Sequence, residues 1–233
     1  MGALANRFIE FCRSVPGAEE IDALALTSQQ KALKLKCADF LFEDRSIICE
    51  IKSLETDTAW KFIAFLKQQG FELPPGEYSV QQLFSTRPNG QELFQKATSV
   101  VATSVADGLA DANRQIRDTK RLLGITAADG VVVILNGMVE VLGPQLVIKR
   151  ILERLDKLGD EGTPYHSHVA LILYFSEKHL RETAEGDAAV AFPIRNEGVP
   201  ALTDLNAVAS KFVKGWAEFN GRWYDEQAFD LWL

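Results

Sequence analysis

Two short runs of β-branched and aromatic residues, 37–42 and 46–51, flank a polar turn and predict a β-hairpin. If the loop closes symmetrically, Asp39 lies opposite Glu50, and Lys52 lies on the same face two residues further along. The alternation of side chains along the two strands gives this hairpin two apolar faces. Leu41 and Ile48 share the face of the charged residues, and the other face holds Phe40, Phe42, Ile47 and Ile51.

Two continuous apolar runs, 130–136 and 168–175, predict strands that are buried on both faces of a sheet. Residues 144–155 between them have apolar positions at helical spacing and a proline in the first turn, which predicts a helix. A strand, helix, strand unit of this length requires parallel pairing through a right-handed crossover. The pattern therefore predicts an α/β fold with a mixed sheet, an antiparallel hairpin extended by parallel strands, and helices on both faces.

Helical spacing recurs along the rest of the chain. It predicts helices at 4–15, at 57–69 before Gly70, at 92–123 with a break near Gly108, and at 203–220. Residues 21–36 predict a second helical piece or an irregular segment that leads into the first strand.

Two segments are predicted to be less regular. Residues 71–93 contain proline and glycine turn markers and predict a long loop, which would be a lid, a substrate-binding insertion or plain surface packing. Residues 188–194 predict an edge strand that is broken by Pro193. We therefore expect an α/β core over residues 1–185, with an insertion at about 71–93, and an edge strand and helix over 186–233 that pack on this core.

The composition is that of an ordinary globular protein, with 47% hydrophobic and 24% charged residues among 233. The net charge of -7 argues against a broad nucleic-acid-binding surface, although a basic groove can coexist with an acidic remainder. Cys12, Cys37 and Cys49 lie in apolar surroundings, and no secretory or membrane-spanning segment is present, so we expect reduced core cysteines in a cytoplasmic protein.

Opposed carboxylates on neighbouring strands are the candidate chemistry of the hairpin. Asp39 and Glu50 would repel each other at the distance between paired strands, and their apolar neighbours predict partial burial. A divalent cation that bridges them would remove this repulsion, because hard cations such as Mg²⁺ take carboxylate oxygens as ligands. The alternative is a solvated hairpin on which Glu50 and Lys52 lie on an exposed face.

Asp39 followed by Glu50-Ile51-Lys52 resembles the signature of the PD-(D/E)XK, or restriction-endonuclease-like, nuclease superfamily, with Ala38 at the position of the proline. The resemblance implies hydrolysis of a nucleic-acid phosphodiester that depends on Mg²⁺ or Mn²⁺. Asp39, Glu50 and the carbonyl of Ile51 would hold the metal ion, and Lys52 would orient the attacking water and stabilise charge on the phosphate. A bound metal ion lowers the pKa of its water and polarises the phosphoryl oxygen.

Gln115 and Thr119, four residues apart on the predicted helix 92–123, resemble a second motif of the superfamily. In several of its branches a glutamine followed by a hydroxyl residue packs behind the metal site, which implies a supporting catalytic role for Gln115. Arg114, Arg117, Lys120 and Arg121 make this the most basic stretch of the chain, and Lys36, Arg117 and Lys120 are candidate nucleic-acid contacts. The alternative is an ordinary helix end in which cations complement the helix dipole.

Further residues of the sequence have more than one interpretation. An extra acidic metal ligand would come from Glu10, Glu19 or Glu20, and each is also explained as a solvated carboxylate. His166 and His168 form either a two-histidine metal pair or, more simply, the entrance of a strand. The aromatic segment 219–233 would stack on bases, cover the core or mediate self-association.

The sequence therefore predicts a nuclease that acts on nucleic acid, on DNA rather than RNA, with no membrane partner and with a possible homodimer. One competing interpretation is a module on the same fold that binds nucleic acid or protein without cleaving anything, which the net charge of -7 favours. Another is an α/β enzyme that acts on a small phosphorylated molecule.

Overall fold

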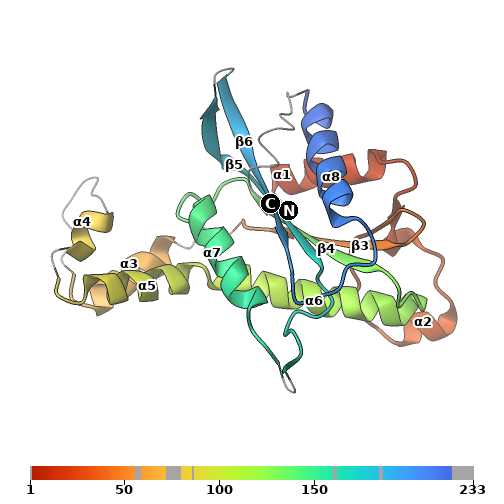
Figure 1. Cartoon of the computed structure of the whole chain (residues 1–233), viewed down its shortest axis with the longest axis horizontal. Helices are drawn as coiled ribbons and strands as arrows, with labels where there is room; N and C mark the ends of the chain where they lie inside the picture. The colour runs from red at the N-terminus through yellow and green to blue at the C-terminus, as the bar shows by residue number, and fades with distance from the viewer. Residues whose placement is uncertain are drawn as a thin grey trace.

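A computed structural model describes residues 2–55, 59–71, 80–85, 87–159, 162–183 and 186–221 (Figure 1). Within these residues one sheet carries six strands in chain order. The first three strands pair antiparallel, β3, β4 and β5 pair parallel, and β6 returns antiparallel to β5. The predicted mixed α/β sheet is confirmed. The strands are β1 (Glu19–Glu20), β2 (Phe40–Phe42), β3 (Ile47–Ser53), β4 (Asp129–Asn136), β5 (Leu171–Thr183) and β6 (Gly186–Arg195).

The β2–β3 hairpin has the predicted register, with Leu41 opposite Ile48. Its turn passes through three consecutive residues in the left-handed region, Glu43, Asp44 and Arg45, at φ of 52°, 52° and 67°. The Arg45 guanidinium holds the turn against β1 through an ion pair of 2.7 Å with Glu19. The two-residue strand β1 is too short to leave a pattern in the sequence and was not predicted.

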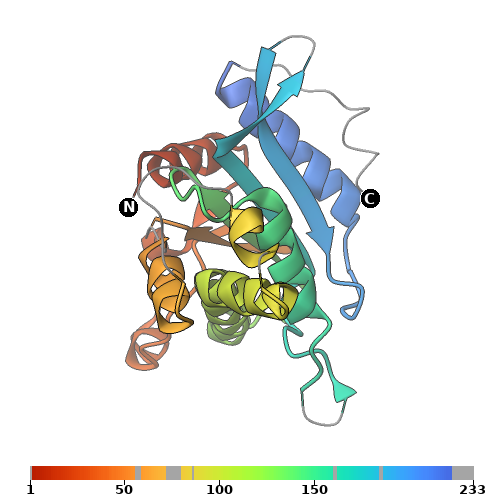
Figure 2. The ribbon, with the colours of Figure 1, turned by 90° about the vertical axis from the view of Figure 1, so that its left-hand side faces the viewer.

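Helices cover both faces of the sheet, as Figure 2 shows from the side. On one face α1 (Ala3–Ser14) and α8 (Leu205–Phe219) enclose an aromatic core around Phe8, whose ring centroid lies 4.9 Å from that of Trp216 and 5.4 Å from that of Phe175. On the other face α6 (Thr103–Leu123) and α7 (Pro144–Leu155) pack on the strands. The short helices η1 (Ile21–Ala23) and α2 (Ser28–Ala32) lead into the hairpin, as one of the two alternatives for this segment predicted.

Three helices project from the body and are called the arm here: α3 (Ala59–Gln68), α4 (Val80–Ser85) and α5 (Gly90–Val101) (Figure 1). The arm has its own small core of Leu66, Phe71, Phe84, Leu93 and Ala97. The prediction of a loop over 71–93 is therefore wrong for α4 and for the start of α5. The reason is that Phe84 is an anchor of the arm core, which the turn markers around it concealed.

The predicted break of the long helix is also misplaced. It occurs at Ala102, between α5 and α6, and Gly108 lies inside α6. A Cβ atom at Gly108 would lie 3.8 Å from Cγ of Lys52, an ordinary contact distance, and α6 continues through the glycine. The break at Ala102 separates α5, which packs in the arm, from α6, which packs on the sheet.

The last two strands differ from their predicted limits. β5 starts at Leu171 rather than at residue 168 and continues to Thr183, and β6 runs through Pro193, which pairs with Leu173. The proline does not break the strand because β6 lies at the sheet edge, where a missing backbone donor is tolerated. β6 is part of the same sheet as the other strands, and α8 packs in the same core as α1.

Some expectations lie outside the described residues, namely the turn at 72–79 and the aromatic residues of 222–233. The three cysteines carry free thiols, and Cys12 and Cys49 are buried as expected. Across the described parts of the chain, no helix is both long enough and apolar enough to cross a membrane.

Candidate active site

Glu50 is a buried carboxyl group on β3, only 2% exposed, on the face of the sheet that α6 covers. Its Oε1 atom lies 2.7 Å from Nζ of Lys52, two residues further along the strand. Its Oε2 atom is buried and accepts no hydrogen bond from the described residues. A buried acceptor without a donor is costly, so this oxygen is available for a ligand.

Asp39 stands one residue before β2, at the end of the hairpin next to Glu50. Its Oδ2 atom accepts a hydrogen bond of 2.7 Å from the backbone N–H of Ile51, and its own N–H donates to the carbonyl of Cys49 at 3.1 Å. In a longer ladder the Ile51 N–H group would donate to a carbonyl group of the neighbouring strand. Here it donates to the Asp39 carboxylate, and this hydrogen bond fixes the Asp39 side chain beside β3.

Burial and mutual repulsion shift the pKa values of the two carboxyl groups. Burial, and then the negative charge of Asp39, raise the pKa of Glu50 to about 8, although the ammonium group of Lys52 opposes the shift. Burial also raises the pKa of Asp39, against the effect of the Ile51 N–H. At neutral pH the pair therefore retains a proton.

Gln115 connects α6 to both strands of the hairpin. Its Oε1 atom accepts a hydrogen bond of 2.5 Å from Lys52 Nζ, and its Nε2 group donates to the carbonyl of Cys37 at 2.8 Å. One turn later, Thr119 Oγ1 donates to the Gln115 carbonyl and accepts from the N–H of Ala38, both at 2.8 Å. The glutamine and hydroxyl pair thus fixes the lysine and the segment before β2 that carries Asp39.

Replacing Thr119 with valine is expected to lower the free energy of unfolding by about 1–3 kcal/mol, because the buried N–H of Ala38 loses its acceptor. Urea denaturation followed by circular dichroism measures the change. Thr119→Ser keeps the hydroxyl group and should stay within about 1 kcal/mol of the wild type. Equal stability of the valine and serine variants would show that this hydrogen bond does not hold α6 to the hairpin.

The three glutamates that were candidates for an additional metal ligand have other partners in the structure. Glu19, Glu20 and Glu10 form ion pairs with arginines, at 2.7 Å for Glu19 with Arg45, 2.8 Å for Glu20 with Arg13 and 3.8 Å for Glu10 with Arg13. These contacts explain the three glutamates as surface ion pairs. None of them is brought into contact with the Asp39 and Glu50 carboxylates.

The three predicted nucleic-acid contacts differ in their position relative to the site. Lys36 is exposed and lies 3.4 Å from Asp111, which itself lies 3.9 Å from Lys52, so Lys36 is near the site. Arg117 pairs with its neighbour Asp118 at 2.9 Å. Lys120 is partly buried, and burial lowers its pKa. Of the three, only Lys36 therefore shares a partner with the site.

The surroundings of His166 bear on the two interpretations of the histidines. His166 is fully buried, and neither ring nitrogen has a hydrogen-bond partner in the described residues. Burial and the nearby Arg154 lower the pKa of His166 to about 4, so the ring is neutral at pH 7. The simpler prediction, histidines near the entrance of a strand, agrees with these surroundings.

Two acidic residues near the site were missed. Asp111 lies on α6 four residues before Gln115, and this spacing places both on one helix face. That spacing was the signal in the sequence. Asp22, in η1, contributes negative charge that raises the pKa of Asp39, but nothing in the sequence pattern links it to the hairpin.

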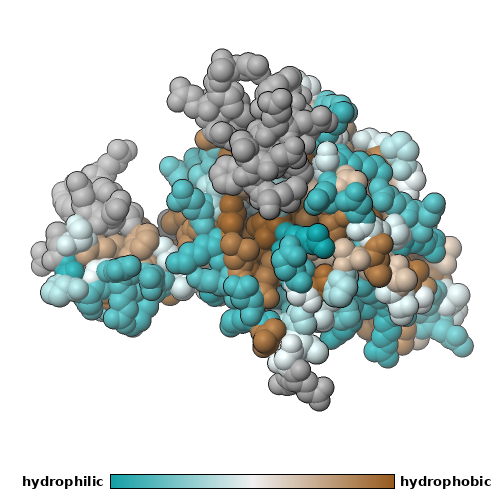
Figure 3. Space-filling view, viewed as in Figure 1, coloured by the Kyte–Doolittle hydropathy of each residue, from teal (hydrophilic) through white to brown (hydrophobic). Residues whose placement is uncertain are grey.

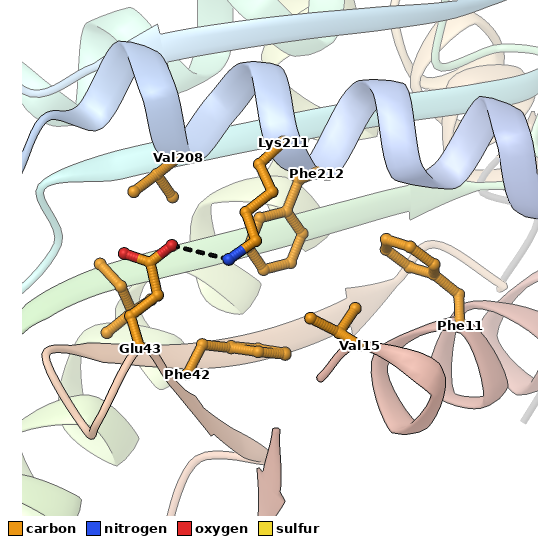
Figure 4. A pocket seen from close by; sticks show the side chains of 8 residues that line it. Phe11, Val15, Phe42, Glu43, Val208, Lys211 and Phe212 are labelled. Atoms are coloured by element: carbon orange, nitrogen blue, oxygen red, sulfur yellow. Dashed lines mark hydrogen bonds and ion pairs between the residues drawn. The ribbon is translucent and has the colours of Figure 1, made fainter. Parts of the chain in front are cut away.

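A recess of about 450 Å³ opens beside Lys52, between the end of β3 and the first turns of α6. Its lining includes Ser53, Glu55, Ser104 and Gly108. A second hollow, of about 290 Å³, lies between the hairpin turn, α1 and α8 (Figure 4). It is lined mainly by apolar side chains and is crossed by a 2.9 Å ion pair between Glu43 and Lys211, so it presents fewer polar groups to a ligand than the recess does.

No protein-family model matches this chain, and no curated protein or solved structure is significantly similar to it. Any assignment of function therefore depends on the site itself. In the described residues, no group of three or more His, Cys, Asp or Glu side chains is arranged to hold a metal ion. What the site offers is a pair of adjacent carboxyl groups, an ammonium group beside them and a recess next to that ammonium group.

Proposed function

We propose that this protein hydrolyses phosphodiester bonds of nucleic acid with Mg²⁺ or Mn²⁺ as cofactor. The observation that carries the proposal is the convergence of Asp39, Glu50 and Lys52 at the end of the hairpin, with a buried Glu50 oxygen that accepts no hydrogen bond from the part of the chain that the structure describes. In support, the described strands form a mixed sheet, antiparallel in the hairpin and parallel from β3 to β5, and this general α/β class is compatible with the fold that the resemblance implies.

The donor atoms fit a small, hard cation. The carboxylates of Asp39 and Glu50, with the carbonyl of Ile51, would be its protein ligands. Mg²⁺ typically uses one or two carboxylates and completes its shell with water and substrate phosphate, whereas Ca²⁺ takes six to eight oxygen ligands. A site with two carboxylate side chains therefore suits Mg²⁺ or Mn²⁺ better than Ca²⁺. When bound, such a cation polarises a phosphoryl oxygen and lowers the pKa of water.

The residues of the chain supply the rest of the chemistry. The Lys52 ammonium group is held by Gln115 on one side and Glu50 on the other, so its direction is fixed before a substrate arrives. A fixed cation at this position stabilises negative charge as it develops on a phosphate group. Gln115 acts as a positioning residue, because it contacts Lys52 and the strand that leads to Asp39.

The test is cleavage of single-stranded, double-stranded and branched DNA, and of RNA, with and without Mn²⁺. Asp39→Asn is expected to lower the metal-dependent rate by more than about 10²-fold, because it removes one charged ligand. Asp44→Asn is the matched control, since Asp44 is an exposed residue of the hairpin turn. Cleavage by Asp39→Asn at the rate of the control would contradict the proposal.

A second candidate function is a module that binds a metal ion and nucleic acid or protein without cleavage. The net charge of -7 favours it. Calorimetric titration with Mn²⁺ distinguishes the two candidates. Uptake of Mn²⁺ that Asp39→Asn abolishes, with no cleavage of any of these substrates, would support the binding module. The proposal also includes a preference for DNA over RNA, which the same substrates test. It includes a homodimer as well, which a measurement of mass in solution tests.

A further inference from the structure

One face of α3 on the arm is apolar, cationic and exposed. Trp60, Ile63 and Lys67 follow each other at helical spacing on this face. The Trp60 side chain is 62% exposed, the largest fraction of any aromatic residue in the described parts of the chain, and Ile63 is 40% exposed. Leu66 lies in the arm core instead. Figure 3 shows apolar side chains at the surface of the arm as well as in the middle of the body.

The charges of α3 are all positive. Its ten residues include Lys61 and Lys67 and no acidic residue, in a chain whose net charge is -7. The Lys61 ammonium group lies 5.8 Å from the centroid of the Trp60 ring. An exposed ring next to ammonium groups is the combination that binds single-stranded nucleic acid, because bases stack on the ring and phosphates pair with the cations. The net charge of this helix is therefore complementary to a polyanion.

The position of the arm connects this face with the candidate active site. The chain enters the arm after Leu54 and Glu55 and leaves it before Ser104 and Val105, and all four residues line the recess beside Lys52. Ser104 contributes a buried hydroxyl group with no hydrogen-bond partner in the described residues. A strand bound along α3 would therefore reach a polar recess that adjoins the catalytic lysine.

We propose that the exposed face of α3 binds single-stranded nucleic acid, with a base stacked on Trp60 and phosphates paired with Lys61 and Lys67. The inference rests on the proposed function for the fate of the bound strand, which would be cleavage beside Lys52. Single strands and unpaired ends are preferred, because the faces of bases within a duplex are already stacked on each other and do not reach the indole ring. The sequence of the strand matters little, since every base has a face that stacks.

The binding test uses the full chain in EDTA, so that no cleavage occurs, with fluorescein-labelled single-stranded DNA, the corresponding duplex and RNA of the same sequence. Trp60→Ala is expected to weaken binding of the single strands about tenfold and to leave duplex binding nearly unchanged. Trp60→Phe keeps an aromatic ring and should restore most of the affinity. Tyr165→Ala is the matched control, because Tyr165 is another exposed aromatic residue, 50% exposed, in the segment that follows α7.

The salt dependence of binding tests the cations separately. Lys61→Gln and Lys67→Gln should each reduce the slope of log affinity against log salt by about 0.7, the value for one phosphate contact to a single strand. Unchanged slopes in both variants would contradict the phosphate contacts.

The results also separate this inference from the proposed function. If Trp60→Ala binds single strands as tightly as the wild type, the inference is wrong even if Mn²⁺-dependent cleavage is observed. If the same variant keeps full affinity but changes the mass in solution, the face binds a second copy of the chain and the inference is also wrong. If Trp60→Ala loses affinity and the wild type cleaves no substrate, the α3 surface stands and the nuclease proposal fails.

Discussion

Replacing Glu50 with glutamine is expected to remove metal-dependent cleavage while making the protein increasingly more stable than the wild type as the pH rises from 4.5 to about 8. The amide has nearly the shape of the carboxylate but no charge for a cation, so we expect the rate to fall by more than about 10²-fold. Stability rises because the wild-type carboxylate is 2% exposed and lies beside Asp39. This charge is buried only in the folded state, so removing it stabilises the folded state relative to the unfolded chain.

The effect on stability depends on pH. The pKa of Glu50 rises from 4.5 to about 8 on folding, so the folded protein keeps a proton that the unfolded chain releases between these values. The free energy of unfolding therefore falls as the pH rises through this window, by on the order of 5 kcal/mol from this group alone. The glutamine variant lacks this loss, and its advantage over the wild type should be small at pH 4.5 and grow toward pH 8.

Urea denaturation in EDTA at several pH values measures this difference, and cleavage assays with Mn²⁺ measure the activity. Glu197→Gln is a suitable control, because the Glu197 side chain is 80% exposed. A glutamine variant of Glu50 whose stability follows that of the wild type at every pH would show that this carboxyl group is not held in a costly environment.

Replacing Lys52 with methionine is expected to lower the cleavage rate by about 10²–10³-fold, the usual effect of removing one group that stabilises charge in the transition state. The methionine side chain still packs against Gly108, whereas the contacts with Glu50 and Gln115 are lost. Because Lys52 is not a proposed metal ligand, calorimetry should still detect Mn²⁺ uptake by the variant. Uptake with little turnover would separate the role of Lys52 from those of Asp39 and Glu50.

Lys178→Met is the control for this prediction, since Lys178 lies on β5 and pairs with the exposed Glu140. Loss of Mn²⁺ uptake in Lys52→Met would mean that the lysine shapes the carboxylate pair rather than the reaction. Full activity of Lys52→Met would remove the lysine from the mechanism.

The sequence predicted the hairpin well because its register depends on local alternation. Leu41 and Ile48 are apolar on one face, and Phe42 and Ile47 on the other, and a shift of the register by one residue would exchange these side chains between the two packed faces of the sheet. The same alternation brought Glu50 and Lys52 to one face, and both are found there. Whether these residues catalyse a reaction remains a prediction, since the comparisons offer no relative that would decide it.

The features that were missed depend on contacts between distant segments. α4 is too short to be stable by itself and forms because Phe84 packs on Phe71 and Phe94 in the arm. The break at Ala102 coincides with a change of packing partner, from the arm to the sheet, which no residue type in this stretch indicates. Asp22 comes near Asp39 only because the two-residue strand β1 pairs with β2.

The arm leaves and rejoins the body at a single place, where residues on both sides of it line the recess beside Lys52. The order and pairing of the six described strands do not pass through it. During evolution, segments of other lengths can therefore replace the arm without disturbing the hairpin. Related chains that differ in substrate choice should then vary most between the end of β3 and the start of α6.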